Sequence, residues 1–310
     1  MAKIKVSNKN WRVYATIVAT ILAVIFVYWQ REAIIKGFEQ IKNANPLWLL
    51  VGILAQMSSV VAAATVYYQI ALKKTKFFNL FIAQTASLFT SRVTPASVGG
   101  IATMGKVLSN SGHKVVELSA VISTNAIVTF MGNVTITLLA LLISGRSIMD
   151  GFKIPKIIFL IPIFLIIALG VVYFMKSLRQ KVVSFVTELL QTLKLYEHRK
   201  KRLLLGFLAG LVTTLGYMVA LWASGMSMGV SLSVLAVIVT VSLGTLGASA
   251  TPLPGGVVGA EATLALTMTQ FGVSADQAIA IAFTYRFITY WLPILPGYIA
   301  TQYALRSKVL

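Results

Sequence analysis

Long apolar runs alternate with short basic segments along most of this chain. A transmembrane helix needs about 20 apolar residues to cross a hydrocarbon core of about 30 Å. Six runs approach that length, and they cover residues 13–29, 47–72, 115–143, 155–175, 202–223 and 275–304. The short alternating strands of a β-barrel are not visible in the sequence. The pattern therefore predicts six full transmembrane helices.

Two further apolar regions are interrupted near their middles. Residues 78–110 contain "TPASVGG" (94–100), and residues 232–272 contain "TPLPGGVVGAE" (251–261). Proline removes a backbone N–H and disfavours helix at the residue before it, whereas glycine allows conformations that are closed to other residues. We therefore expect two re-entrant broken hairpins, each of which enters and leaves the membrane on one side.

The two interrupted regions belong to halves of the chain that resemble each other. "GILAQMSSVV" (52–61) resembles "GFLAGLVTTL" (206–215), and each half reads as span, broken hairpin, span. The sequence predicts one transmembrane domain over 1–310, with repeat one at about 47–143 and repeat two at about 202–304. Inverted repeats with broken helices recur in secondary transporters. The alternative is a duplication that is kept only for stability.

Composition supports a membrane protein and limits the chemistry. The chain is 57% hydrophobic and 11% charged and contains no cysteine, so disulfides and thiolate metal sites are excluded. The fold class predicted is an all-α polytopic integral membrane protein. A net charge of +19 would suggest a nucleic-acid partner in a soluble protein, but in a membrane protein the distribution of the charge matters instead, and no nucleic-acid partner is expected.

The basic residues predict the orientation of the chain. With the N-terminus inside, 19 Lys and Arg residues lie in inside segments and 6 in outside segments. Cytoplasmic segments are rich in Lys and Arg. We therefore expect cytoplasmic N- and C-termini in a bacterial-type plasma membrane. By this count the first hairpin opens from the cytoplasm and the second from outside.

The largest basic segment spans 176–202 and carries apolar residues on one helical face. It predicts a cytoplasmic amphipathic helix that lies in the interface and binds anionic lipid. The alternative is an ordinary basic connecting loop. His113 and His198 lie in basic loops, where we expect them to be solvated, and the sequence offers no metal site.

The two breaks are the first candidates for a binding site. A helix that restarts after a break presents unpaired N–H groups and a positive dipole end, which suit a phosphate or another anion. The alternative is simple turn chemistry at a hairpin tip. The break residues assigned to substrate binding are Thr94, Pro95, Gly99, Gly100, Thr251, Pro252, Pro254, Gly255, Gly256 and Gly259.

Charged residues inside apolar sequence are the second candidates. Intramembrane charges are rare and usually paired, so Glu261 and Arg286 are predicted to pair and to help bind an anionic or zwitterionic headgroup. The alternative is a fixed structural salt bridge. Arg92 either contacts phosphate or extends to the cytoplasmic headgroups. The remaining candidates are Asn125, at the place in repeat one that Arg286 has in repeat two, and Tyr290 and Trp291.

A family resemblance rests on these same residues. "TPLPGGVVGAEATLAL" followed by "YRFITYWLPILPGY" (285–298) resembles the lysylphosphatidylglycerol synthase transmembrane family, the flippase-like membrane half of the multiple peptide resistance factor. The first hairpin departs from the family pattern with Gly99, Gly100 and Lys106. The resemblance implies movement of a phospholipid such as aminoacylated phosphatidylglycerol between leaflets, and hence a role in resistance to cationic antimicrobial peptides.

The sequence leaves two functions open. We expect a lipid flippase or transporter with no catalytic residues and no cofactor, whose partners are membrane phospholipids; a homodimer is left open. The alternative is a lipid-modifying transferase, either a phosphatidylglycerol lysyltransferase or a polyprenyl-linked glycosyltransferase. Full-length relatives carry a soluble transferase domain that uses charged tRNA. Because few residues follow the last predicted span, the sequence favours transport over catalysis.

Overall fold

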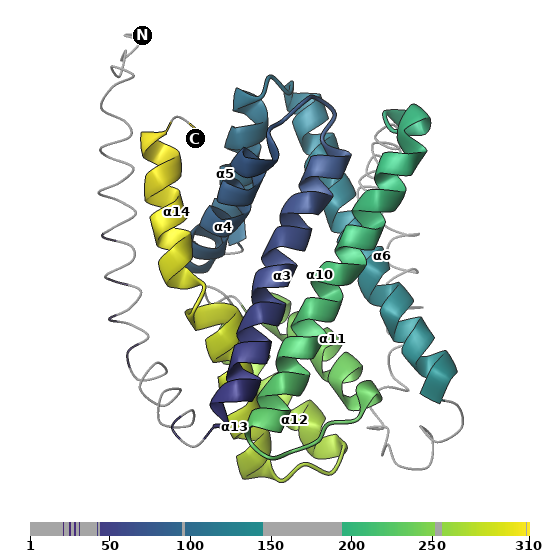
Figure 1. The fold of residues 1–310 in the computed structure, drawn as a ribbon, viewed down its shortest axis with the longest axis vertical. Helices are drawn as coiled ribbons and strands as arrows, with labels where there is room; N and C mark the ends of the chain where they lie inside the picture. The colour runs from purple at the N-terminus through teal and green to yellow at the C-terminus, as the bar shows by residue number, and fades with distance from the viewer. Residues whose placement is uncertain are drawn as a thin grey trace, which may run out of the picture.

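The computed structural model describes residues 44–94, 97–144, 194–251, 256–307 and 309–310, together with the isolated positions 21, 25, 28, 31 and 42; side chains of 140–144 and 249–250 are not described. Every regular element within these residues is helical (Figure 1). The predicted spans 13–29 and 155–175 and the predicted interfacial helix 176–202 lie wholly or largely outside the described residues.

Four helical segments of the described chain are long and apolar enough to cross a membrane. They are Pro46–Ile70, Val115–Leu139, Glu197–Ser227 and Ala275–Arg306. The first is helix α3 (Pro46–Ile70), the second lies in α6 (Val115–Ser144), and the third contains the short 3₁₀ turn η3 (Glu197–Arg199) and α10 (Lys200–Ser227). These helices agree with the predicted spans 47–72, 115–143 and 202–223.

Helices α3 and α10 form the centre of the molecule and run in opposite directions. In Figure 1, α3 rises from the lower end to the upper end while α10 descends beside it. The Ser59 hydroxyl, which is buried, donates to the Thr213 carbonyl of α10 at 3.1 Å. Gly216 of α10 faces α3 so closely that an added Cβ would lie 2.7 Å from the Ala55 carbonyl oxygen. The absence of a side chain here allows the two helices to approach.

This contact predicts a large effect of one methyl group. We expect Gly216→Ala to lower the free energy of unfolding by about 1–3 kcal/mol, because overpacking forces the helices apart. Gly132→Ala is the matched control, because its added Cβ would lie 3.6 Å or more from any neighbour. Thermal unfolding of both variants in detergent tests this. Equal melting temperatures would show that α3 and α10 do not pack as described.

Each of the two motifs predicted to break a helix does so. The first lies between α4 (Phe77–Val93) and α5 (Val98–Asn110), and the second between α11 (Val234–Ala250) and α12 (Gly259–Gln270). The two helices of each pair pack against each other. In Figure 1, α4 and α5 occupy the upper half of the molecule, whereas α11 and α12 occupy the lower half. Entry from opposite membrane faces stays a prediction.

The last membrane segment is less regular than its sequence predicted. The predicted span 275–304 contains α13 (Ala275–Arg286), the π-helix η5 (Phe287–Trp291) and α14 (Ile294–Arg306). The Leu292 N–H donates to the Phe287 carbonyl at 2.8 Å, five residues back. Pro293 follows and cannot donate to the carbonyl four residues before it. Single turns of π-helix inside α-helices are rare and frequent at functional sites.

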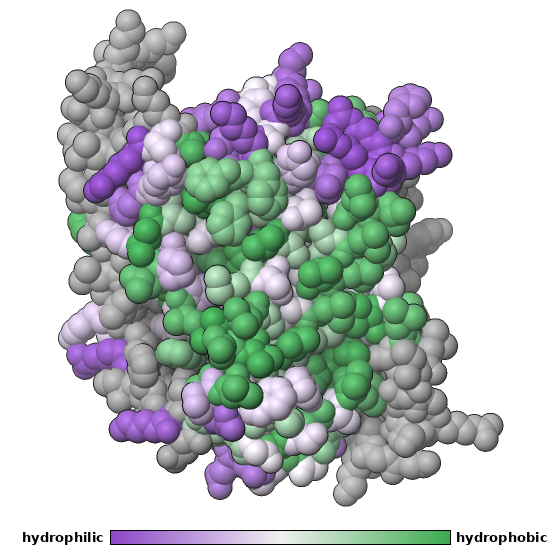
Figure 2. Space-filling view, viewed as in Figure 1, coloured by the Kyte–Doolittle hydropathy of each residue, from purple (hydrophilic) through white to green (hydrophobic). Residues whose placement is uncertain are grey.

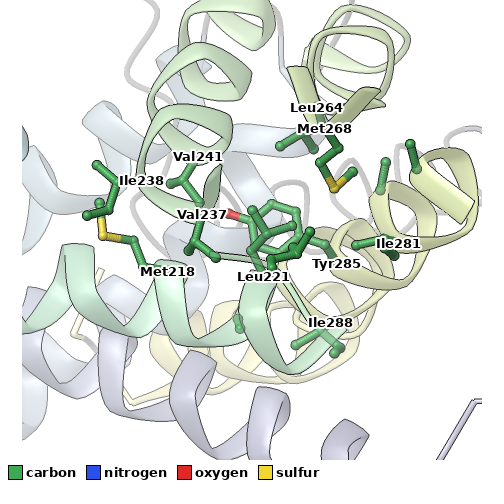
Figure 3. Packing of buried hydrophobic residues seen from close by; sticks show 14 of the residues in the cluster. Met218, Leu221, Val237, Ile238, Val241, Leu264, Met268, Ile281, Tyr285 and Ile288 are labelled. Carbon is green, nitrogen blue, oxygen red and sulfur yellow. The ribbon is translucent and has the colours of Figure 1, made fainter. Parts of the chain in front are cut away.

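A hydrophobic core joins α10 to α11, α12 and α13. Figure 3 shows Leu221 of α10, Val237 and Val241 of α11, Leu264 of α12 and Tyr285 of α13 pointing toward one another. Val241, Leu264 and Tyr285 also border the cavity described below. The core therefore fixes one wall of that cavity.

The surface has an apolar band between two polar ends. Figure 2 shows hydrophobic side chains across the middle and strongly hydrophilic ones mainly at the upper end. The upper ends of α3, α4, α5, α6, α10 and α14 carry the basic residues Lys73, Lys74, Lys76, Lys106, Lys114, Lys200, Lys201, Arg202 and Arg306. No Lys or Arg occurs between Arg202 and Arg286. Positive charge is therefore concentrated at one end of the described chain.

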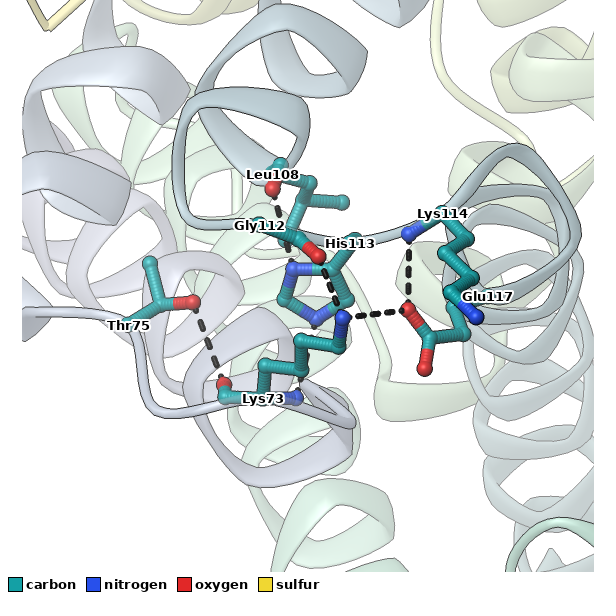
Figure 4. A network of polar contacts seen from close by, with 7 residues as sticks. All are labelled: Lys73, Thr75, Leu108, Gly112, His113, Lys114 and Glu117. Atoms are coloured by element: carbon teal, nitrogen blue, oxygen red, sulfur yellow. Dashed lines mark hydrogen bonds and ion pairs between the residues drawn. The ribbon is translucent and has the colours of Figure 1, made fainter.

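His113 connects two loops at this basic end (Figure 4). The sequence predicted a solvated side chain, which is wrong, because His113 is 5% exposed. Its Nε2 accepts from the Lys73 backbone N–H at 3.0 Å, and its Nδ1 lies 2.9 Å from the Leu108 carbonyl oxygen. These contacts require neutral imidazole with the proton on Nδ1. The Lys73 ammonium, which lies 3.2 Å from Glu117, also donates to the Gly112 carbonyl.

This arrangement predicts that acid weakens the fold. Burial lowers the pKa of His113, and the positive charges of Lys73 and Arg199 act in the same direction, opposed by the Leu108 carbonyl and Glu117. The unfolded chain therefore binds the proton more tightly than the folded chain. The stabilisation by neutral His113 is complete above the ordinary pKa of about 6.5 and is lost as pH falls below that value.

Thermal unfolding between pH 5 and pH 8 tests the role of His113. We expect the melting temperature to fall on acidification in the wild type and to depend less on pH in His113→Gln. His198, the second histidine of the chain, is exposed, so His198→Gln is the matched control and should keep the wild-type profile. A pH profile that is unchanged by His113→Gln would contradict this account.

Candidate functional site

The first break is stabilised by a threonine and by a close helix approach. The Thr94 hydroxyl donates to the Thr90 carbonyl at 2.7 Å and accepts from the Gly99 N–H at 2.8 Å. A Cβ on Gly99 would lie 2.4 Å from the Thr90 carbonyl oxygen, and one on Gly100 would lie 1.9 Å from the Ser91 hydroxyl. The two glycines therefore allow α5 to fold back onto α4.

The second break uses the same chemistry. The Thr251 hydroxyl donates to the Gly247 carbonyl at 2.9 Å, four residues back, as Thr94 does in the first break. A Cβ on Gly259 would lie 2.6 Å from the Gly247 carbonyl oxygen. Gly256 and Val258 have φ angles of +63° and +73°, which are strained for a β-branched residue such as valine. The predicted site residues Pro95, Pro252, Pro254 and Gly255 lie outside the described residues.

Side chains that flank the two breaks pack together. Val93, the last residue of α4, and Val257, beside the second break, pack in one cluster with Tyr290. Arg92 crosses between the halves, and its Nη2 donates to the Thr289 carbonyl at 2.7 Å. Its guanidinium carbon lies 5.0 Å from the centre of the Tyr290 ring. The side chains beside both breaks therefore share one site.

Proline explains why the Thr289 carbonyl is available to Arg92. In an α-helix this carbonyl would accept from the N–H of residue 293. Residue 293 is proline, which has no N–H, and Arg92 supplies a donor in its place. The same side chain also donates to the Leu88 carbonyl of its own helix.

Glu261 and Arg286 form the ion pair that the sequence predicted. Arg286 Nε lies 2.8 Å from Glu261 Oε1, and both side chains are largely buried. The second carboxylate oxygen of Glu261, Oε2, is buried and has no hydrogen-bond partner among the described residues. The Arg286 guanidinium carbon lies 4.0 Å from the centre of the Tyr290 ring, so two arginines contact one tyrosine.

A polar cavity of about 310 Å³ lies beside this group. Arg92 and Arg286 are each 8% exposed and Tyr290 is 3% exposed. Helices α4, α6, α10, α11, α12, α13 and η5 all contribute to its wall. The polar lining residues are Arg92, Thr129, Asn133, Thr213, Thr214, Tyr217, Thr245, Tyr285, Arg286, Thr289 and Tyr290. The cavity therefore combines two positive charges with hydroxyl and amide groups.

The structure separates the predicted site residues into three groups. Arg92, Arg286 and Tyr290 line the cavity. Glu261 and Trp291 lie just behind it, where Glu261 pairs with Arg286 and Trp291 packs edge-on against Tyr290 with ring centroids 5.0 Å apart. The described break residues Thr94, Gly99, Gly100, Thr251, Gly256 and Gly259 shape the two turns and are not among the lining residues.

The predicted helix-terminus site receives limited geometric support. Ala260, in the first turn of α12, borders the cavity, but no residue of α5 does.

Asn125 lies outside the cavity, and Asn133, two turns further along α6, lines it instead. Sequence reasoning also missed Thr213, Thr214 and Tyr217. Their signal was two adjacent threonines and a tyrosine within an otherwise apolar span.

No metal centre is apparent in the part of the chain that the structure describes. Within those residues, no three His, Asp or Glu side chains come together in a group that could hold a metal ion.

The fold and the site together define a polytopic helical membrane protein with a cavity whose wall contains two buried arginines. A family model, the lysylphosphatidylglycerol synthase TM region, matches residues 13–297. The chain therefore belongs to this family, which is consistent with a lipid-related function in the membrane. It is also 31% identical over 145 residues to a UPF0104 membrane protein of Archaeoglobus fulgidus; the match covers 44% of this chain and 42% of that protein.

Proposed function

We propose that the chain is a lipid transporter that moves a phospholipid between leaflets by binding its headgroup in the polar cavity. One observation carries this proposal, namely the excess of positive charge at the cavity wall. Arg92 and Arg286 are both buried there, and Glu261 pairs with Arg286. Within the described chain, Arg92 contacts two carbonyl oxygens and an aromatic ring, and forms no ion pair with a carboxylate.

A phosphate group would complete this arrangement. Burying an ion is costly unless a counter-ion and hydrogen bonds compensate for its lost hydration. Arginine binds phosphate with two parallel N–H groups. Threonine hydroxyls and the Asn133 amide would accept from or donate to a glycerol headgroup, since both kinds of group do both. Phospholipid headgroups present this combination of phosphate and hydroxyl groups.

The arrangement of the helices supports transport across the membrane. Broken backbone at membrane depth is tolerated where it lines a cavity or is buried in protein. The α4–α5 pair lies in the basic half and the α11–α12 pair in the other half, as an inverted repeat requires. We place the basic end in the cytoplasm of a bacterial-type plasma membrane, following the positive-inside rule, with anionic lipids around that end.

The family suggests the class of lipid. Aminoacylated phosphatidylglycerol carries both a phosphate and ammonium groups. The two arginines would bind the phosphate, and Glu261 Oε2, which has no hydrogen-bond partner among the described residues, would bind an ammonium once the pair with Arg286 opens. A cationic lipid delivered to the outer leaflet would reduce binding of cationic peptides. This part of the proposal rests on the family and on the presence of one carboxylate beside two arginines.

A lipid-modifying transferase is the second candidate, and it is supported by the synthase name of the family model. Reconstitution of the full chain into liposomes separates the two candidates. Exchange of a labelled phosphatidylglycerol between leaflets without any added donor supports transport. Formation of a modified lipid only when aminoacyl-tRNA or a polyprenyl-linked sugar is supplied, without exchange, would overturn the proposal.

A further inference from the structure

A second hollow lies against helices α12 and α13, which also contribute to the wall of the polar cavity. It has a volume of about 340 Å³ and is formed by α12, α13, the turn before α12, and Trp291. Of the nine residues that the structure places around it, eight are apolar and the ninth is Glu261. This apolar groove therefore differs in chemistry from the polar cavity, which has two arginines in its wall.

The groove and the cavity border different faces of the contact between α12 and α13. On α12, Ala260 and Leu264 face the cavity, while Ala262 and Ala265 face the groove. On α13, Tyr285 and Arg286 line the cavity, whereas Ile279, Ala282 and Phe283 line the groove. The Glu261–Arg286 ion pair joins the two helices across this contact, with Glu261 lining the groove and Arg286 lining the cavity.

Small residues from both helices line the groove. Ala262 and Ala265 are one helical turn apart on α12, and Ala282 lies on α13, so short side chains leave room between the two helices for an apolar chain. Tyr290 of the cavity and Trp291 of the groove are in edge-on contact. An amphiphile with its polar end in the cavity would place its apolar part beside Tyr290 and Trp291.

We infer that the groove is a second binding site, which holds one acyl chain of the lipid whose headgroup occupies the cavity. This inference rests on the proposed function and adds to it a path for the hydrocarbon. The Glu261–Arg286 pair closes that path, and opening the pair would join the cavity to the groove. A phospholipid could then keep its acyl chain among apolar side chains while its phosphate contacts Arg92 and Arg286.

Two photoactivatable phosphatidylglycerols test the inference in nanodiscs that contain the full chain. One carries a diazirine in the middle of an acyl chain, and the other carries it on the headgroup. The acyl-chain probe should label Ala262 and Phe283, and the headgroup probe should label Tyr217. Because the chain has no cysteine, Ala265→Cys can be modified with a benzyl thiosulfonate after folding. Leu266→Cys is the control, since Leu266 is 65% exposed and does not line the groove.

Benzylation of Ala265→Cys should lower labelling of the groove by the acyl-chain probe about tenfold, equivalent to about 1.4 kcal/mol of binding. Benzylation of Leu266→Cys should leave it unchanged. Acyl-chain labelling spread evenly over exposed residues such as Leu246 and Leu295 would overturn the inference. So would a groove that neither the acyl-chain probe nor the thiosulfonate can reach because another segment of the chain covers it. The headgroup probe reports on the proposed function separately, because its labelling of Tyr217 does not depend on the groove.

Discussion

Arg286→Ala is expected to abolish lipid exchange and to destabilise the protein. The substitution removes a cavity cation and leaves Glu261 buried without its partner. Breaking a buried pair in this way costs about 3–5 kcal/mol. Leaflet exchange in liposomes measures the first effect, and thermal unfolding in detergent measures the second. Arg306→Ala, which removes an exposed arginine from α14, should change neither.

A neutral pair distinguishes binding from a purely structural salt bridge. The double variant Glu261→Gln/Arg286→Gln keeps two groups that can hydrogen-bond to each other and buries no charge. We expect it to recover most of the stability that Arg286→Ala loses, because no uncompensated ion remains. Exchange should stay absent, because the phosphate has lost one of its two arginines. If the double variant exchanged lipid at the wild-type rate, the pair would be structural only.

Arg92→Gln is expected to reduce exchange strongly and to lower the free energy of unfolding by about 1–3 kcal/mol, because the Thr289 carbonyl loses its donor. Its guanidinium is buried without a carboxylate partner among the described residues, so its removal deletes no ion pair. Hydrogen bonds to a charged group contribute about 1.5–3 kcal/mol, which corresponds to roughly a 10- to 150-fold lower affinity for phosphate. Binding of phosphatidylglycerol in detergent, measured by native mass spectrometry, tests this expectation.

Arg92→Lys is the matched variant. Lysine keeps the charge but lacks the planar fork that binds phosphate through two N–H groups and the Thr289 carbonyl at the same time. We expect intermediate binding. Wild-type binding by both Arg92→Gln and Arg92→Lys would contradict a role for Arg92 in headgroup recognition. The hydrogen bond from Arg92 to the Thr289 carbonyl would then be structural only.

The helices of the described chain were largely predictable because the signals are local. Apolar length predicted α3, α6 and α10, and the proline–glycine motifs predicted both breaks. The π-helix at Phe287–Trp291 was not predicted, because Pro293 and Pro296 in the sequence indicate an irregularity but not its form. The buried position of His113 was missed because it depends on a contact with Lys73, 40 residues away.

The charged residues of the candidate site were predictable from the sequence. Glu261 and Arg286 stood out as ions in apolar sequence, and their pairing followed from the cost of burying either alone. The pairing of Arg92 with Thr289 spans 197 residues, so no local pattern could show it. Sequence reasoning missed Thr213, Thr214 and Asn133 because the sequence does not show which helix a polar side chain within a span will face. Their cavity forms only where α6 and α10 meet helices from other parts of the chain, among them α4, α11 and α13.

A cryo-electron microscopy structure of the chain in nanodiscs containing phosphatidylglycerol tests the central claim most directly. The account predicts headgroup density within hydrogen-bond distance of Arg92 and Arg286 and beside Tyr290. Density for ordered lipid around the outside of the protein, with the cavity closed by side chains from the two halves, would contradict it.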